Sequence, residues 1–353
     1  MTETQSLLPH YMDSTMMSCA RTCLQKFHTE FCLGLRPAET SIDLHAGGCV
    51  SASLESFYRA TYEDGLDTPS ATGRALARFF HEWDDFEPKK DTAKTRENMW
   101  AAVESYIQKY PPRTDHVQPY SFDGQTSVEF SFAIPLEPAA PWADVIGDKE
   151  KYFPLHPVTG EPWIYVGRFD LLGELTNGAS RQVVIRDEKT AGRLETNWSD
   201  KWNLRSQFLG YCWALQQMGI NCSTVVVRGI IITKKEIRQV EAIKPYSQFL
   251  IERWHEQLRR DLWRITRAWQ EQYFDWNLGE ACTMYGNCPF MDRCTSPHPD
   301  RWNSSYKVAR WNPLARNPIA ETSIASPSTS IAKIASLGLA IPPNPTLELA
   351  RIP

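Results

Sequence analysis

Two short acidic segments of the chain carry the residue types best suited to chemistry. Asp170 follows an apolar, β-branched run at 163–166, and Glu188 and Lys189 follow a second such run at 183–185. If these runs are neighbouring strands, their ends bring an Asp, a Glu and a Lys together. Two carboxylates can hold a hard divalent cation, which can activate a water and neutralise a phosphate. With a lysine to orient that water, these groups are the minimum for cleaving a phosphodiester bond.

Three of the nine cysteines form a second candidate site. Cys282, Cys288 and Cys294 are each separated by five intervening residues in the C-terminal part of the sequence. They lack the Cys-x-x-Cys spacing typical of zinc knuckles, so an iron–sulfur cluster is favoured over zinc, and over no metal at all. Cys23 is the preferred fourth ligand and Cys19, one helical turn away, is the alternative. The other thiols are expected in the core, namely Cys32, Cys49, Cys212 and Cys222.

The bulk composition indicates a soluble globular protein. The chain has 353 residues, 42% hydrophobic and 23% charged, with a formal net charge of -4. It shows no secretory signal and no apolar run of about 18 residues, which predicts a cytoplasmic protein without a membrane span. The charge excludes a basic nucleic-acid coat but allows local patches. The arginine-rich segment 253–267 is either a solvated helix face or a ridge that contacts phosphates.

The hydrophobic patterns predict a helical N-terminal region followed by mixed strands and helices. We expect helices near 12–33, 49–63 (opened by a Gly47-Gly48 turn), 70–84, 92–110, 200–218 and 246–275. We expect strands near 127–134, 163–175, 181–188, 224–233 and 236–243, with a loop at 137–162. This order predicts an α/β fold with a mixed central β-sheet flanked by helices. Residues 311–353, rich in Pro, Ser and Ala, predict an extended or disordered tail.

The order of these features resembles the PD-(D/E)XK nuclease superfamily. Asp170, then Glu188-Lys189, then Gln207-x-x-x-Tyr211 match the motifs of its RecB-like branch. One early and three late cysteines outside that core are similar to the CRISPR-associated iron–sulfur exonucleases and phage recombination nucleases. The resemblance covers about residues 14–296. It implies a restriction-endonuclease-like core within a domain 1–310, a helical insertion at about 45–110 and a C-terminal cysteine-rich loop.

The resemblance also implies an activity and residue roles. The chain would be a DNA nuclease, with exonuclease action preferred, that acts in repair or recombination and has DNA and a recombination or single-strand-annealing protein as partners. Asp170 and Glu188 would hold Mg²⁺ or Mn²⁺, Lys189 would support the attacking water, and Arg168 would contact phosphate. Gln207 and Tyr211 would hold the substrate strand. A structural 4Fe–4S cluster would be held by Cys23, Cys282, Cys288 and Cys294.

One position departs from the family pattern. Relatives carry a metal-binding histidine in an early Gly-x-x-x-His-x-x-Leu-Glu motif, and the matching segment 47–55 has Ser51 there. Either two carboxylates and water suffice, or His45 or Glu55 substitutes, or the site is inactive. Two alternatives to a nuclease therefore stay open. They are an inactive iron–sulfur DNA-binding protein and a zinc-stabilised protein that binds a partner in a phage or recombination complex.

Overall fold

The computed structural model describes residues 6–88, 91–122, 124–138, 151–283 and 287–315. Its helices are α1 (Ser14–Thr22), α2 (Leu24–Phe27), a π-helical turn (His28–Cys32), α3 (Ile42–Tyr62), α4 (Thr68–Trp83), α5 (Arg96–Lys109), α6 (Ser206–Gln217), α7 (Gln248–Glu271), α8 (Glu280–Thr283) and α9 (Met291–Thr295), with 3-10 turns at Asp200–Trp202 and Pro299–Ser305. Its strands are β1 (Tyr11–Met12), β2 (Leu35–Pro37), β3 (Val117–Pro119), β4 (Ser121–Phe122), β5 (Gln125–Thr126), β6 (Val128–Pro135), β7 (Ile164–Asn177), β8 (Ser180–Ala191), β9 (Thr224–Ile232), β10 (Ile237–Pro245) and β11 (Tyr306–Val308).

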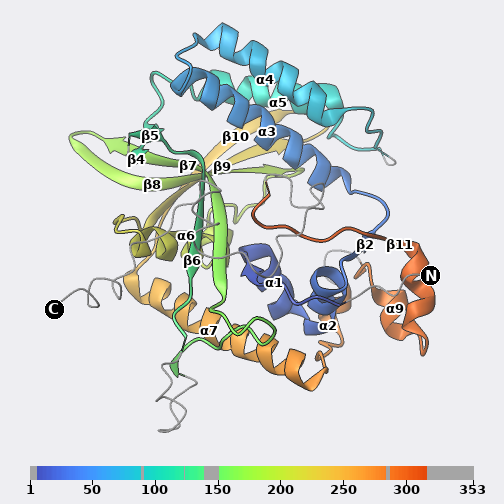
Figure 1. The fold of residues 1–353 in the computed structure, drawn as a ribbon. Helices are drawn as coiled ribbons and strands as arrows, with labels where there is room; N and C mark the ends of the chain where they lie inside the picture. The colour runs from blue at the N-terminus through green and yellow to red at the C-terminus, as the bar shows by residue number, and fades with distance from the viewer. Residues whose placement is uncertain (1–5, 89–90, 123, 139–150, 284–286, 316–353) are drawn as a thin grey trace, which may run out of the picture.

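A seven-stranded mixed sheet forms the centre of the molecule (Figure 1). Its main path is β1-β7-β8-β9-β10, and β3 and β6 also pair with β7. β7 and β8 form an antiparallel hairpin, β8 and β9 run parallel, and β10 returns antiparallel to β9. The α/β fold class with a mixed, helix-flanked sheet is therefore confirmed.

Helices cover both faces of this sheet. In Figure 1, α3, α4 and α5 lie above it, and α1, α6 and α7 lie below it. β9 is a run of Val and Ile, as expected of a strand buried on both faces. Its successive side chains alternate between the two cores: Val225 and Val227 pack with α6 and α7, whereas Val226 and Ile230 pack with α3–α5.

The N-terminal region is more divided than the sequence pattern predicts. The expected helix 12–33 is interrupted at Cys23, whose backbone is extended (φ -166°, ψ 119°), so that α1 ends and α2 begins there. The expectation of a turn at Gly47-Gly48 was wrong, because both glycines lie inside α3. That helix begins at the Ser41 cap, whose hydroxyl accepts a hydrogen bond from the backbone of Leu44.

The two ends of the described chain meet beside α1. β11 pairs antiparallel with β2, in the register Val308↔Leu35, and so closes over the N-terminal helices. The predicted tail, 311–353, lies outside the described residues apart from 311–315. Among the helices that the structure describes, none combines the length and the apolar character needed to cross a membrane.

Candidate active site

The β7–β8 hairpin brings the predicted acidic residues together. Leu171 on β7 faces Arg186 on β8, so Asp170 and Asp187 are adjacent across the two strands. The Asp170 carboxylate accepts a hydrogen bond of 2.7 Å from the backbone N–H of Glu188. Asp170 is thereby fixed at the point where the two strands separate.

Lys189 is directed to Asp187, a residue that the sequence analysis did not select. The Lys189 ammonium lies 2.6 Å from the Asp187 carboxylate. The Lys189 side chain is 28% exposed, and Asp187 is almost completely buried. Positions 187 and 189 are two apart on a strand and therefore face the same side. The two-residue period of a strand could have identified Asp187 from the sequence, because it places Asp187 and Lys189 on one face. Glu188 and Lys189 are adjacent on the strand and therefore point to opposite faces.

Burial and repulsion between carboxylates raise the pKa of both aspartates in this cluster. Burial and the nearby charges of Asp187 and Glu188 raise the pKa of Asp170 well above its usual value. Burial also raises the pKa of Asp187, and Lys189 offsets only part of that shift. The pKa of Lys189 is raised too: burial lowers it, but the charges of Asp187 and Asp170 outweigh burial. The two Asp side chains repel each other, and a divalent ion between them would relieve that repulsion.

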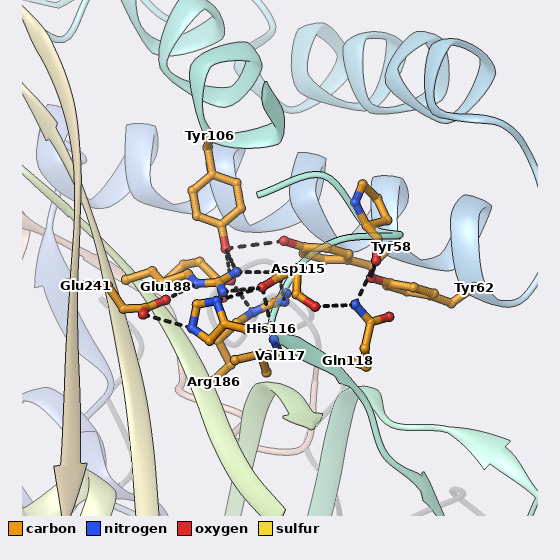
Figure 2. A network of polar contacts seen from close by, with 12 residues as sticks. Tyr58, Tyr62, Tyr106, Asp115, His116, Val117, Gln118, Arg186, Glu188 and Glu241 are labelled. Atoms are coloured by element: carbon orange, nitrogen blue, oxygen red, sulfur yellow. Dashed lines mark hydrogen bonds and ion pairs between the residues drawn. The ribbon is translucent and has the colours of Figure 1, made fainter. Parts of the chain in front are cut away.

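Glu188 belongs to a buried network under the helical layer (Figure 2). Its Oε1 accepts a hydrogen bond of 2.5 Å from the Tyr106 hydroxyl of α5 and lies 2.7 Å from Nε of Arg186. Burial raises the pKa of Glu188, but the Arg186 charge and the Tyr106 hydrogen bond lower it more, so the net shift is downward. Glu188 is thus ionised and already paired. Its role as a metal ligand stays a prediction, while Asp187 has the surroundings expected of one.

The same network contains a second buried arginine. Arg228 on β9 makes two contacts, of 2.6 and 2.7 Å, with the Asp115 carboxylate, and its guanidinium lies 3.7 Å from the ring centre of Tyr110. Asp115 also lies 3.6 Å from the Arg186 guanidinium, and both arginine side chains are fully buried. Asp115 therefore links the loop after α5 to β8 and β9. This network fastens the helical layer to the back of the strand that carries Asp187 and Lys189.

Glu129 is a further carboxylate at the site that sequence reasoning missed. It lies on β6 between Val128 and Phe130, which pair with Leu171 and Phe169 on either side of Asp170. Its φ of 51° is unusual for a residue other than glycine. Its charge raises the pKa of Asp170. A local sequence pattern gives no signal for such a position, because it depends on the register of two strands that are distant in the chain.

The helix α6 places Gln207 and Tyr211 next to these acids. The Gln207 amide donates a hydrogen bond of 2.9 Å to the Tyr211 hydroxyl, which in turn donates one of 2.6 Å to the backbone carbonyl of Arg168. Tyr211 is buried and Gln207 is half-buried. Nε of Arg168 donates to the Ser131 hydroxyl at 3.0 Å. The expected convergence of α6 on β7 is thus present, whereas contacts with a substrate remain predictions.

Ser51, which occupies the histidine position, and the two possible substitutes, Glu55 and His45, differ in their surroundings. Ser51 is exposed on α3. Glu55 pairs with Arg59 at 2.9 Å. The His45 ring stacks on Phe86 with 3.9 Å between ring centres, so it is a packed side chain. Among the described residues no hydrogen bond or ion pair joins His45 to the acidic cluster.

The predicted cysteine site is assembled from both ends of the chain. The pKa of Cys294 is raised by burial and then by the neighbouring thiols Cys288, Cys23 and Cys282. Cys23 is half-buried at the break between α1 and α2, where its backbone is extended. Cys19 is buried, and its thiol contacts Glu30 at 3.9 Å. The expected core positions hold for Cys32, Cys49, Cys212 and Cys222, which are all buried.

The divalent-ion site and the cysteine site place different demands on their donor atoms. In the part of the chain that the structure describes, no three His, Cys, Asp or Glu side chains converge on one metal ion. Hydrated Mg²⁺ keeps several waters and needs only one or two carboxylates, so Asp170 and Asp187 are a sufficient set. In a 4Fe–4S cluster each thiolate binds a different iron, so the four thiols need not meet at one point.

Together the fold and site define an α/β protein whose central hairpin carries two carboxylates and a lysine. No protein-family model matches the sequence, and no curated protein matches it either. The structure is similar to a chain from Eubacterium rectale named "Putative exonuclease", with 13% identity, a TM-score of 0.38, and coverage of 82% of this chain and 94% of that one. It is also similar to the protein SSO0001, with 12% identity, a TM-score of 0.23, and coverage of 60% and 72%. At these values the similarity carries no argument about function.

Proposed function

We propose that this protein is a divalent-metal-dependent deoxyribonuclease with a RecB-like PD-(D/E)XK site. The observation that carries the proposal is the convergence of Asp170, Asp187 and Lys189 on one side of the β7–β8 hairpin. Mg²⁺ or Mn²⁺ fits the two aspartates, and when bound it supplies an activated water and charge neutralisation at the phosphate. We propose in addition that it acts as an exonuclease and has a recombination or single-strand-annealing protein as a partner.

The side chains of the site have distinct tasks in this reaction. Asp170 and Asp187 provide the oxygen ligands, and the hydrogen bond from the Glu188 backbone keeps Asp170 oriented. Lys189, partly exposed and cationic, can donate to the attacking water or to a phosphate oxygen. The chain from Gln207 through Tyr211 to the Arg168 carbonyl fixes α6 against β7 and leaves the half-buried Gln207 to meet the substrate.

Cleavage of DNA should depend on both the metal and Asp170. Anaerobically purified protein, incubated with end-labelled single- and double-stranded DNA, is expected to cut when Mn²⁺ or Mg²⁺ is added and not in EDTA. Asp170→Asn should lower the rate on the order of 10³-fold, because it removes a charged ligand while keeping the side-chain shape. Equal rates for Asp170→Asn and the parent would rule out the assignment.

One observation favours a second candidate function. Ser51 stands on the exposed surface of α3, where the family pattern has its metal-binding histidine. A protein that binds DNA without cutting it would fit this loss. The cleavage assay separates the two functions, because a protein with full DNA affinity and no metal-stimulated cleavage supports the binding function alone.

We further propose that Cys23, Cys282, Cys288 and Cys294 hold a structural 4Fe–4S cluster, with zinc as the alternative. Cys282→Ser is expected to lower the iron content and to reduce the melting temperature by at least about 5 °C, because a structural metal site contributes folding free energy. Cys19→Ser is the matched control and should keep both. A colourless parent protein loaded with zinc would favour the alternative, and an unchanged melting temperature of Cys282→Ser would exclude a structural role.

A further inference from the structure

A polar groove adjoins the candidate active site, and of the residues that line it the proposed chemistry uses Gln207 alone. It lies between the N-terminal helices α1 and α2 and the segment that leads into α6, and its volume is about 800 Å³. Gln207 and Arg205 line the end of the groove near the acids, and Thr22 and Lys26 line its other wall. The Arg205 charge lowers the pKa of Asp187, which shows that this end of the groove is next to the site.

Two basic residues of the groove form no ion pair within the described part of the chain. Arg205 is exposed, and among the described residues neither Arg205 nor Lys26 forms an ion pair. Lys201, the third basic residue there, pairs with Glu195 at 3.2 Å. The acidic residue Glu30 is neutralised by Arg36 at 2.9 Å, which leaves Asp200 as the other carboxylate of the lining. Uncompensated cations with little opposing charge favour an anionic ligand.

The rest of the lining suits a nucleic-acid strand. Ser14, Thr15, Ser18 and Thr22 contribute hydroxyl groups, which are common neutral partners of phosphate oxygens. Leu204 at the edge of the groove is 73% exposed. A flat polyanion that carries apolar bases matches this combination of cations, hydroxyls and apolar surface.

An exposed tryptophan lies on the segment that contacts the α1–α2 junction, outside the lining of the groove. Trp276 is 51% exposed. Its neighbours contact the start of α2 and the groove residue Thr22: the Asp275 carbonyl accepts a hydrogen bond of 3.1 Å from the backbone of Gln25, and the Asn277 amide donates one of 2.8 Å to the carbonyl of Thr22. An exposed indole in this place can stack on a base without regard to sequence.

We propose that this groove binds a single nucleic-acid strand that enters the Asp170–Asp187 site. Arg205 and Lys26 contact phosphates, and Trp276 stacks on a base at the far end. A cavity of this volume has the size of a small-molecule pocket and is too small to seat a double helix. The proposal rests on the proposed nuclease function, since it names the form of the substrate at the same site.

Binding without cleavage tests the groove directly. Fluorescence anisotropy of an end-labelled oligothymidylate is measured in EDTA over a range of salt concentrations, with the duplex of the same length for comparison. Arg205→Ala and Lys26→Ala should each reduce the slope of log affinity against log salt by about 0.7, the value for one lost phosphate contact on a single strand. Trp276→Ala should weaken binding about 10-fold with the slope unchanged, as for one lost stacking contact.

Matched controls keep the result specific to the groove. Arg193→Ala removes an arginine that is 84% exposed outside the lining, and Trp302→Ala removes another exposed tryptophan; both should bind as the parent does. Parent-like affinity and slope in all three groove variants would overturn the proposal, as would duplex binding of equal strength. If the protein cleaves DNA while these variants bind normally, only the groove is wrong. If the strand binds through these residues but is never cut, only the nuclease is wrong.

Discussion

Asp187→Asn is expected to abolish metal-dependent DNA cleavage, with a loss on the order of 10³-fold, while Glu188→Gln leaves most of it. Asp187 faces Lys189 and Asp170, whereas the Glu188 carboxylate is engaged by Arg186 and Tyr106 under the helical layer. Both substitutions remove one charge from the same strand and preserve side-chain shape. The pair therefore separates the two candidate ligands with a single chemical change.

The two variants should also differ in stability, and here the substitution that keeps most of the activity, Glu188→Gln, should be the more destabilising one. Glu188→Gln leaves the buried Arg186 with one carboxylate fewer, so its midpoint of chemical denaturation should fall below that of the parent. Asp187→Asn removes a carboxylate whose pKa is raised by burial, so it should be as stable as the parent or more so. Cleavage rates measured well below the lower of the two denaturation midpoints, where both variants are folded, decide which residue is the metal ligand. Loss of cleavage in Glu188→Gln with full cleavage in Asp187→Asn would reverse it.

Asp115→Asn is expected to destabilise the protein by about 3 to 5 kcal/mol, the cost of breaking a buried ion pair from one side. Arg228 and Arg186 are fully buried and both lie near the Asp115 carboxylate, so the substitution leaves buried positive charge with less compensation. Glu236→Gln, which breaks the exposed pair with Arg238, is the control and should unfold at the parent's denaturant concentration. If Asp115→Asn also unfolds at the parent's denaturant concentration, the buried network around Asp115 contributes no stability.

The contribution of Asp115 should depend on pH in a defined direction. Burial raises its pKa, but the hydrogen bonds and charge of Arg228 lower it more, so the folded value lies below the usual 3.8. A carboxyl group with a lowered folded pKa stabilises the protein above its unfolded pKa, and this stabilisation is lost as the pH falls through the folded pKa. The difference in unfolding free energy between parent and Asp115→Asn should therefore be full at pH 7 and shrink below about pH 4. Denaturant titrations at several pH values measure it.

The sequence predicts the sheet well because its strands are locally distinctive. The expected strands at 163–175, 181–188 and 224–233 correspond to β7, β8 and β9, where β-branched runs are buried on both faces. The N-terminal helices were harder to predict. Gly47 and Gly48 resemble a turn but lie within α3, and the break at Cys23 has no local breaker such as Gly or Pro.

The site was only partly predictable, for two different physical reasons. Asp187 could be found from the period of a strand, since alternate residues share a face. Glu129 and Asp115 could not, because each reaches the hairpin through pairing or packing between segments that are far apart in the sequence. That Cys23 lies near the three late cysteines was predicted from chemistry alone, because a cluster held by those three needs a fourth thiol.

The pairing of β2 with β11 has a consequence for how the protein is made. The partner of Leu35 is Val308, so β2 can pair with β11 only when the ribosome has translated almost all of the described chain. Until then the nascent chain carries an open strand edge beside the otherwise buried Leu35, which invites association with other chains. We therefore expect products truncated before residue 306 to aggregate during expression.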